Sequence, residues 1–367
     1  MESIVIGGKN KKSNYLLVFM KVIFLASLRS SSASGRQRLW ALQQCGVNVS
    51  IIDKDNYSSK LGRLAGYLGK LCQSPKLLYN TSKLQQDLIN FTMQIKPDVI
   101  WLEWAKELQP AVLMQLQKLR PRPFLISFQD DNPWGDRRTD SWMWRDYFRV
   151  IPNFDMHLVK RPIDIKNLNL LGAKSCRIWR HGLYKLLFYP PSININKIYP
   201  VSFVGTCMDQ RVELIKYLLE HKLPVHVFGN RWDQRSDLPM RFPANFHPAV
   251  EGEQYAEVIR KSQICLGLVS HSNHDEWTMR TYEVPGCAGL LLAERTPTHE
   301  ELFLEGKEAV FFSTPQECAS KLLDLLKEPE LCRSIGEAAY QKCLLNNWTL
   351  EGQMQELLYD LQKRVDI

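Results

Sequence analysis

Ionisable side chains gather in residues 271–283, directly after the apolar stretch Ile264–Ser270, which we expect to be a buried strand. If the chain from Met279 to Gly286 is helical, Arg280 and Glu283 lie three residues apart on one face. An arginine there can hold a diphosphate through two parallel hydrogen bonds, and a carboxylate can accept hydrogen bonds from a ribose diol. The alternative is a surface Arg–Glu pair worth a few tenths of a kcal/mol.

A second candidate site follows the apolar stretch 201–204. Gly205 and Thr206 form a tight turn, and Arg211 lies on the first turn of the helix expected next. Backbone N–H groups at such a turn favour a phosphate, and Arg211 can add a charged contact. The alternative is an ordinary strand–helix turn with a surface arginine, because the sequence has neither GxGxxG nor GxxxxGK[ST].

Short apolar runs alternate with amphipathic stretches from Val22 onward, which predicts parallel strands covered by helices on both faces. In the first half the expected helices are 35–45, 84–96 and 108–119, and the expected strands are Val22–Ser27, Val47–Asp53, Asp98–Trp104, Phe124–Asp130, Asp155–Lys160 and Cys176–His181. The proline-containing segment 188–199 then interrupts the alternation and is typical of an interdomain linker.

The alternation resumes in the second half. Strands are expected at Val201–Thr206, Val225–Asn230, Ile264–Ser270, Leu290–Glu294 and Ala309–Ser313, with helices at 209–221, 254–262, 279–286, 316–327 and 330–345. The pattern predicts an α/β protein of two Rossmann-like, doubly wound domains that face each other across a cleft. We assign residues 1–19 to a tail, 20–187 to the first domain, 200–347 to the second, and 348–367 to a helix that packs back on the first.

Charge divides the chain into unlike halves. Residues 1–185 contain 29 Lys and Arg against 14 Asp and Glu, a net +15, whereas residues 186–367 contain 18 against 25, a net −7. A basic half indicates a polyanionic partner, such as an anionic glycan or a phospholipid surface, or else a solvated basic surface. Nucleic acid is disfavoured, because no recognised binding module is present.

The cysteines and the N-terminus bear on the compartment. The nine cysteines include no CxxC pair, which fits a reducing, cytoplasmic location better than a disulfide framework. The apolar run after Lys12 is too short to span a bilayer and is interrupted by Lys21. We therefore expect a buried first strand rather than a signal peptide, and Met20 is an alternative start of translation.

Residues 246–312 resemble the donor domain of the group 1 glycosyltransferases, and most closely the branch of the CgeB-like spore-maturation proteins. The likeness is carried by an Arg-x-x-Glu pair that opens a helix (Arg280, Glu283), by the turn glycines Gly286 and Gly289, and by a Phe-x-x-Gly-x-Glu segment at 303–308. It covers most of residues 200–345, whereas the first half matches only in layout.

The resemblance implies a GT-B fold, a nucleotide-diphosphate sugar bound mainly by the second domain, and an acceptor bound mainly by the first. Many members have two glutamates eight positions apart, and here Asp275 and Glu283 have that spacing, with Asp in the first place. The implied catalysis is metal-independent and retaining in tendency, since arginines and helix N-termini can stabilise the leaving diphosphate. No metal site and no cofactor beyond the sugar nucleotide are expected.

The developing positive charge on the sugar and the acceptor hydroxyl call for carboxylates or a histidine in the cleft. Asp275, Asp131 and His181 are the candidates for catalysis; Gly205, Thr206, Arg211, Arg280 and Glu283 are those for binding the donor. Alternatively, Asp130-Asp131 caps a turn and His181 lies in a structural hinge. The loop of residues 27–36 and the aromatic stretch 134–148 are further candidates for contacts with the acceptor.

The leading hypothesis is therefore a cytoplasmic glycosyltransferase that uses a nucleotide-sugar donor, with a peripheral location at the inner face of the membrane as the alternative. Its acceptor is expected to be a neutral or anionic glycan, or a lipid-linked cell-envelope molecule. A sugar-nucleotide 2-epimerase of the same fold and a non-catalytic nucleotide- or glycan-binding relative remain alternatives.

Overall fold

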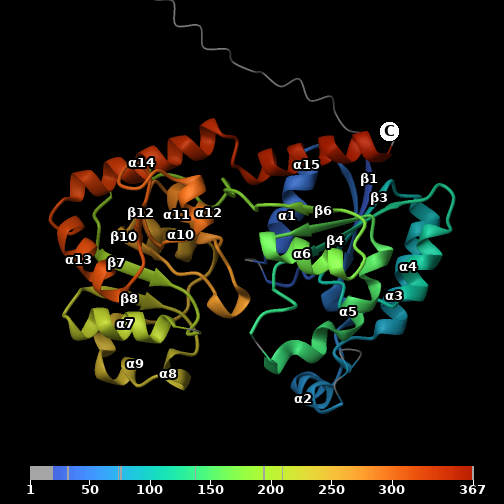
Figure 1. Ribbon diagram of the computed structural model, residues 1–367, viewed down its shortest axis with the longest axis horizontal. Helices are drawn as coiled ribbons and strands as arrows, with labels where there is room; N and C mark the ends of the chain where they lie inside the picture. The colour runs from blue at the N-terminus through green and yellow to red at the C-terminus, as the bar shows by residue number, and fades with distance from the viewer. Residues whose placement is uncertain are drawn as a thin grey trace, which may run out of the picture.

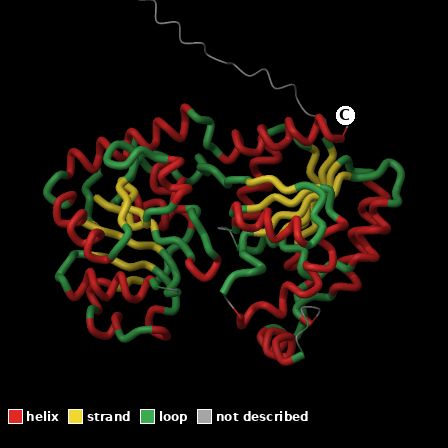
Figure 2. The backbone as a smooth tube through the Cα atoms, in the orientation of Figure 1, coloured by secondary structure: helices red, strands yellow, loops and turns green. Residues whose placement is uncertain are grey.

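The structure is a computed structural model that describes residues 20–30, 33–72, 74, 77–136, 138–192, 195–208 and 210–365. The tail predicted for residues 1–19 lies outside these residues. Two parallel six-stranded sheets form two α/β domains side by side (Figures 1 and 2). The predicted fold class is therefore confirmed.

The first sheet has the strand order β2-β1-β3-β4-β5-β6. Its strands are β1 (Lys21–Ala26), β2 (Asn48–Asp53), β3 (Val99–Glu103), β4 (Phe124–Gln129), β5 (Met156–Val159) and β6 (Cys176–Ile178). The helices are α1 (Ser34–Gln44), α2 (Arg63–Leu71), α3 (Thr81–Ile95), α4 (Pro110–Gln117), α5 (Arg145–Val150) and α6 (Pro162–Leu170).

Alternation along β1 explains why both faces of this sheet are covered. Val22 and Phe24 point into a core shared with α1, whereas Ile23 and Leu25 point into the opposite core with α3 and α4. Successive side chains of a strand face opposite ways, so a run that is apolar throughout needs a layer of helices on each side.

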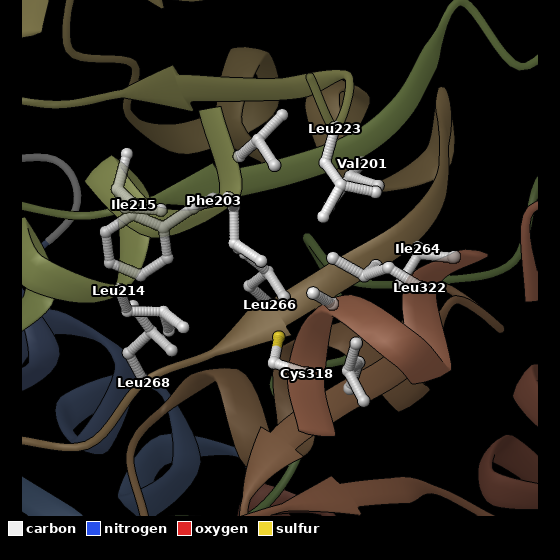
Figure 3. Packing of buried hydrophobic residues seen from close by; sticks show 14 of the residues in the cluster. Val201, Phe203, Leu214, Ile215, Leu223, Ile264, Leu266, Leu268, Cys318 and Leu322 are labelled. Carbon is white, nitrogen blue, oxygen red and sulfur yellow. The ribbon is translucent and has the colours of Figure 1, made fainter. Parts of the chain in front are cut away.

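The second sheet has the order β12-β11-β10-β7-β8-β9. Its strands are β7 (Tyr199–Val204), β8 (Val225–Phe228), β9 (Phe246–His247), β10 (Ser262–Gly267), β11 (Leu290–Glu294) and β12 (Val310–Phe312). The helices are α7 (Arg211–Glu220), α8 (Trp232–Arg235), α9 (Leu238–Arg241), α10 (Gly252–Arg260), α11 (Arg280–Gly286), α12 (Pro297–Leu302), α13 (Pro315–Leu325) and α14 (Pro329–Leu345). One core of this domain, between the sheet and α7 and α13, contains Phe203, Leu266 and Leu322 (Figure 3).

The chain crosses between the domains twice, and the crossings lie together. Trp179 belongs to a core of the first domain, but Leu183 already belongs to a core of the second, so the first crossing precedes the predicted linker. The N–H of Leu183 donates to the carbonyl of Trp348, and the N–H of Leu350 donates to the carbonyl of Leu183, both at 2.8 Å. Helix α15 (Leu350–Val365) then packs on α1 through Leu357 and neighbouring apolar residues (Figure 1).

Several predicted strands end too late. The stretch 264–270 is strand only to Gly267, and 176–181 only to Ile178. Leu268 and Trp179 remain buried after the strand hydrogen bonds stop, so hydrophobicity did not mark the end of pairing. Several short elements were missed: β9, α2, α5, α6, α8, α9 and α12.

The aromatic stretch 134–148 does not form a single helix. A 3-10 segment, Arg138–Trp144, leads into α5, and Trp144 and Tyr147 are buried in a core of the first domain. All nine cysteines are free thiols. None of the helices in the described part of the chain is long and apolar enough to cross a membrane.

Candidate donor-binding cleft

A cleft of about 460 Å³ lies between the domains, at the carboxyl ends of the strands. Ligands of parallel α/β sheets bind at this edge, because the strand–helix turns converge there. Five of the lining residues come from the first domain: Ser34, Gln37, Asp130, Asp131 and Lys160. The others come from residues 187–188 and from the turns of the second domain, among them Gly205, Thr206, Arg211, Phe228, Glu251, Tyr255, Asn273, Asp275, Thr278, Met279, Arg280 and Glu283.

The turn after β7 is shaped by close packing. The N–H of Gly205 donates to the carbonyl of Phe228 at 2.8 Å, and Trp232 Nε1 donates to the carbonyl of Gly205 at 3.0 Å. A Cβ atom at position 205 would lie 2.7 Å from the Phe203 ring and 2.8 Å from Nη2 of Arg280. Glycine is therefore required here for Arg280 to reach across the turn.

Arg280 opens α11 and is held by the backbone beside this turn. Its Nε donates to the carbonyl of Val204 at 2.6 Å, and its guanidinium carbon lies 5.4 Å from the centre of the Phe203 ring. No described residue accepts a hydrogen bond from Nη1 or Nη2, and the side chain lines the cleft. A guanidinium fixed through Nε with both terminal nitrogens available can receive a diphosphate without reorganising.

Glu283 lies one turn further along α11 and is also in the wall of the cleft. Its side chain is buried, and Oε2 accepts a hydrogen bond from the hydroxyl of Tyr255 at 2.6 Å. Burial raises the pKa of Glu283, and the hydrogen bond from Tyr255 and the charge of Arg280 oppose that rise. The structure thus brings Arg280 and Glu283 together with the Gly205–Thr206 turn, as the sequence predicted.

Arg211 lines the cleft, but its guanidinium donates to backbone carbonyls, so its role in donor binding stays a prediction. Nη1 donates to the carbonyl of Thr206 at 2.9 Å, and Nη2 donates to the carbonyls of Leu268 and Val269 at 3.3 and 3.4 Å. The side chain is buried and joins the turn after β7 to the segment after β10. Its contacts position these two backbone segments.

Asp275 is bound by the other domain, which was not expected of a catalytic carboxylate. Oδ2 accepts from Nζ of Lys160 at 2.8 Å, and Oδ1 accepts from Nε of Arg161 at 2.7 Å. Arg161 is itself buried and also donates to Asp164 at 3.1 Å and to the carbonyl of Asp130 at 2.6 Å. Asp275 is therefore the centre of a buried ion cluster that joins the domains.

Further hydrogen bonds join the same two surfaces. Nδ2 of Asn132 donates to the carbonyl of Asn273 at 3.0 Å, and Nδ2 of Asn273 donates to Oδ1 of Asp131 at 3.2 Å. Asp131 remains partly exposed in the cleft, facing the second domain. The position of Asp131 thus fits a contact with the substrate. Asn132, in contrast, has a structural function in the turn.

His181 lies behind the cleft rather than in its wall, which corrects its assignment as a catalytic residue. The side chain is buried, and Nε2 is 2.8 Å from Oε1 of Gln37, a residue that does line the cleft. Burial and the nearby Arg38 charge lower the pKa of His181 well below its ordinary value. It adjoins Gly182 at the crossing between domains, so the alternative of a structural hinge fits its place better.

Within the described residues no group of three or more His, Cys, Asp or Glu side chains is arranged to hold a metal ion. The two histidines beside Asp275 have separate acidic partners: His271 contacts Glu294, and His274 Nε2 lies 2.9 Å from Oδ2 of Asp136. The two carboxylates at 130–131 also diverge, since Asp130 faces Ser34 and Arg38.

Sequence reasoning missed Lys160, Arg161 and Tyr255. Lys160 and Arg161 follow β5 directly, so the rule that singled out Asp130 and Asp131 after β4 would have found them. Tyr255 gave no such signal, because its partner is 28 residues away on another helix and only the fold brings the two side chains together.

A second cavity of about 440 Å³ lies in the first domain, beside Ser34, and was also missed. Its wall contains the buried Lys54–Glu107 ion pair at 2.7 Å, and the Lys106 amine lies 4.2 Å from the centre of the Trp104 ring. Trp104, at the end of β3, adopts a positive φ of 52° that non-glycine residues rarely take outside constrained sites.

The comparisons with known proteins agree with this geometry. Residues 211–359 match a family model described as "Glycosyl transferase-like". That stretch begins at α7 and includes Asp275, Arg280 and Glu283, but not Gly205 and Thr206. No curated protein sequence matches the chain significantly.

Solved structures match across both domains. Sucrose-phosphate synthase from Thermosynechococcus elongatus is similar with a TM-score of 0.66 at 14% identity, covering 94% of this chain and 100% of that one. HepE from Anabaena in complex with UDP-glucose gives 0.63 at 11%, with coverage of 94% and 100%. A glycosyltransferase from Rickettsia africae gives 0.63 at 12%, with coverage of 94% and 98%. The chain thus has the GT-B fold of glycosyltransferases.

Proposed function

We propose that this protein transfers a glycosyl group from a UDP-sugar, bound in the interdomain cleft, to an acceptor hydroxyl presented by the first domain. The observation that carries the proposal is the pairing of Arg280 and Glu283 on one wall of that cleft. The similar HepE structure is a complex with UDP-glucose, which supports uracil as the base of the donor. We also assign the chain to the CgeB-like branch, on the spacing of its motifs.

On the donor side, Arg280 would bind the diphosphate and Glu283 the ribose hydroxyls. The Gly205–Thr206 turn gives the phosphates a close approach to backbone. Because Tyr255 already donates to Oε2 of Glu283, the other carboxylate oxygen is left to accept from the ribose. Lys160 adds a positive charge from the opposite wall.

In the reaction, the acceptor oxygen bonds to the anomeric carbon of the sugar as the bond from that carbon to the β-phosphate oxygen breaks. UDP leaves with the bonding electrons, and the proton of the acceptor hydroxyl passes to a phosphate oxygen or to a carboxylate of the cleft. Arg280 and Lys160 would stabilise the charge that accumulates on UDP. Asp130 and Asp131 are both partly exposed carboxylates on the acceptor side, and we assign Asp131, which Asn273 contacts from the second domain, to the acceptor hydroxyl.

We propose that Arg280 and Lys160 replace a metal ion, so that transfer continues in the presence of a chelator. We propose separately that the sugar configuration is retained. The acceptor would be a glycan or a lipid-linked cell-envelope molecule, and the reaction would take place in the cytoplasm. The cavity beside Ser34 supports a carbohydrate acceptor, since it combines an indole ring with fixed charged groups.

The test is a thermal-shift screen of the whole protein against UDP, ADP, GDP and their sugars, followed by the best ligand with Arg280→Ala and Glu283→Ala. We expect UDP compounds to raise the melting temperature and each variant to lose most of that rise while keeping the unliganded value. If both variants keep the donor affinity of the unmodified protein, Arg280 and Glu283 do not form the donor site. Conversion of the nucleotide sugar without any acceptor would indicate an epimerase instead.

A further inference from the structure

Helix α2 presents its large apolar side chains to solvent. Leu64, Tyr67 and Leu71 are 52%, 69% and 70% exposed, and Leu61, just before the helix, is 51% exposed. Their spacing within the helix, i, i+3 and i+7, places the three on one face. The opposite face, which packs on the protein, is built from the buried Ala65 and Gly69.

This arrangement is the reverse of the usual amphipathic helix, in which the large apolar residues face the core. The inner face is small because the helix lies close to Trp142: a Cβ atom at Gly69 would lie 3.0 Å from that ring. Small residues therefore let α2 approach Trp142 closely, and the outer ridge of Leu61, Leu64, Tyr67 and Leu71 is left exposed to solvent.

The charge around this ridge is of one sign. Residues 56–86 contain five basic residues, Lys60, Arg63, Lys70, Lys76 and Lys83, and no acidic one. Lys60 and Lys70 are exposed. A helix with an apolar ridge flanked by lysine and arginine is suited to the boundary between head groups and acyl chains, where anionic lipids attract the basic residues.

We propose that α2 and its ridge dock the protein on an anionic phospholipid surface. Helix α2 is at the outer end of the first domain, away from α15 (Figure 1). A second protein molecule is less suited to this face, because two copies would bring two sets of basic residues together.

The docking surface lies beside the cavity of the first domain. Trp142, on which α2 packs, precedes Met143 in the wall of that cavity, and the chain after α2 leads to Leu78 and Tyr79 in the same wall. In this respect the inference extends the proposed function, because a lipid-linked acceptor would present its head group next to the cavity. Docking itself does not depend on catalysis and is tested without it.

The experiment is sedimentation of the full chain with sucrose-loaded vesicles, of phosphatidylcholine alone or with 30 mol% phosphatidylglycerol. We expect binding to the anionic vesicles only, weakened by raising salt from 50 to 500 mM. The triple variant Leu64→Ser/Tyr67→Ser/Leu71→Ser should bind at least tenfold more weakly, and Lys60→Glu/Lys70→Glu should lose the preference for phosphatidylglycerol.

The matched control replaces three exposed apolar residues elsewhere, Leu170→Ser/Met240→Ser/Leu345→Ser, which are 77%, 80% and 85% exposed. This control variant should bind vesicles as the unmodified protein does. All variants should keep the melting temperature of the unmodified protein. Vesicle binding that survives the α2 triple variant, or no binding by the unmodified protein, overturns the proposal. The unmodified protein could instead self-associate in the absence of vesicles. If the α2 triple variant abolishes that self-association, the ridge binds a second copy of the chain.

Discussion

The buried cluster around Asp275 makes a prediction that separates an interdomain anchor from a catalytic carboxylate. Asp275 lies in the cleft wall, but Arg161, its partner across the interface, does not. If Asp275 acts by holding the domains together, Arg161→Met and Asp275→Asn should produce the same defect. If it acts on the substrate, Asp275→Asn should be far more damaging to turnover.

The magnitude follows from the burial of the pair. Both side chains are almost fully buried, with exposures of 1% for Arg161 and 4% for Asp275. Removing one partner of a buried ion pair costs about 3–5 kcal/mol, because the other charge stays buried. Lys160 still contacts Asp275, so we expect about 3 kcal/mol, which shifts the equilibrium between closed and open domains roughly 150-fold.

The assay is a double-mutant cycle on kcat/KM for the donor, with small-angle X-ray scattering to follow domain separation. Each single variant should open the protein and lower kcat/KM to a similar extent, and the double variant should be little worse than either. Arg177→Met is the control, because its pairs with Glu356 and Asp360 on α15 are partly exposed and should contribute about 1 kcal/mol or less. An Asp275→Asn protein that stays closed yet loses turnover, beside an active Arg161→Met, would refute the reasoning.

Three further predictions concern single side chains. Gly205→Ala should weaken UDP binding at least tenfold by displacing Arg280, because the new Cβ would lie 2.8 Å from Nη2; calorimetric titration with UDP would check this. Tyr255→Phe should raise the KM for the donor several-fold with little change in kcat, since it frees Glu283 from its 2.6 Å hydrogen bond and alters ribose contacts; steady-state kinetics would show the split. Burial lowers the pKa of His157 from 6.5 to about 4, so its contribution to stability is complete above pH 6.5 and lost as the pH falls to 4. His157→Gln should therefore remove about 3 kcal/mol of that pH dependence in urea unfolding measured at pH 7 and pH 4.

The two-domain fold was predictable because strands covered on both faces are apolar throughout, and such runs alternate with helical periods along this chain. The ends of the strands were not predictable, since Leu268 and Trp179 are still buried although they follow the last hydrogen bonds of their strands. Helix α2 was missed for a related physical reason: its apolar side chains face solvent, so its pattern carries no information about where the core lies.

In the candidate site, too, positions set by local structure were predictable and contacts with distant parts of the chain were not. Arg280, Glu283 and the Gly205 turn were predictable, because a strand–helix turn places them at one edge of the sheet whatever the rest of the chain does. The contacts of Asp275 and Arg211 were not, because they depend on which charges or carbonyls arrive from elsewhere: Lys160 and Arg161 from the other domain, and the carbonyls after β10 from the neighbouring strand.

Asp275 thus ties the use of the cleft to the closure of the domains. The carboxylate that stands eight positions before Glu283 is neutralised by Arg161, and it also fixes Lys160 at the edge of the cleft, opposite Arg280. A diphosphate between Arg280 and Lys160 would contact both domains at once, so donor binding and domain closure would favour each other. If Asp275 acts as such an anchor, the ion cluster that holds it also fixes Lys160, which would be the first domain's positive charge for the leaving UDP.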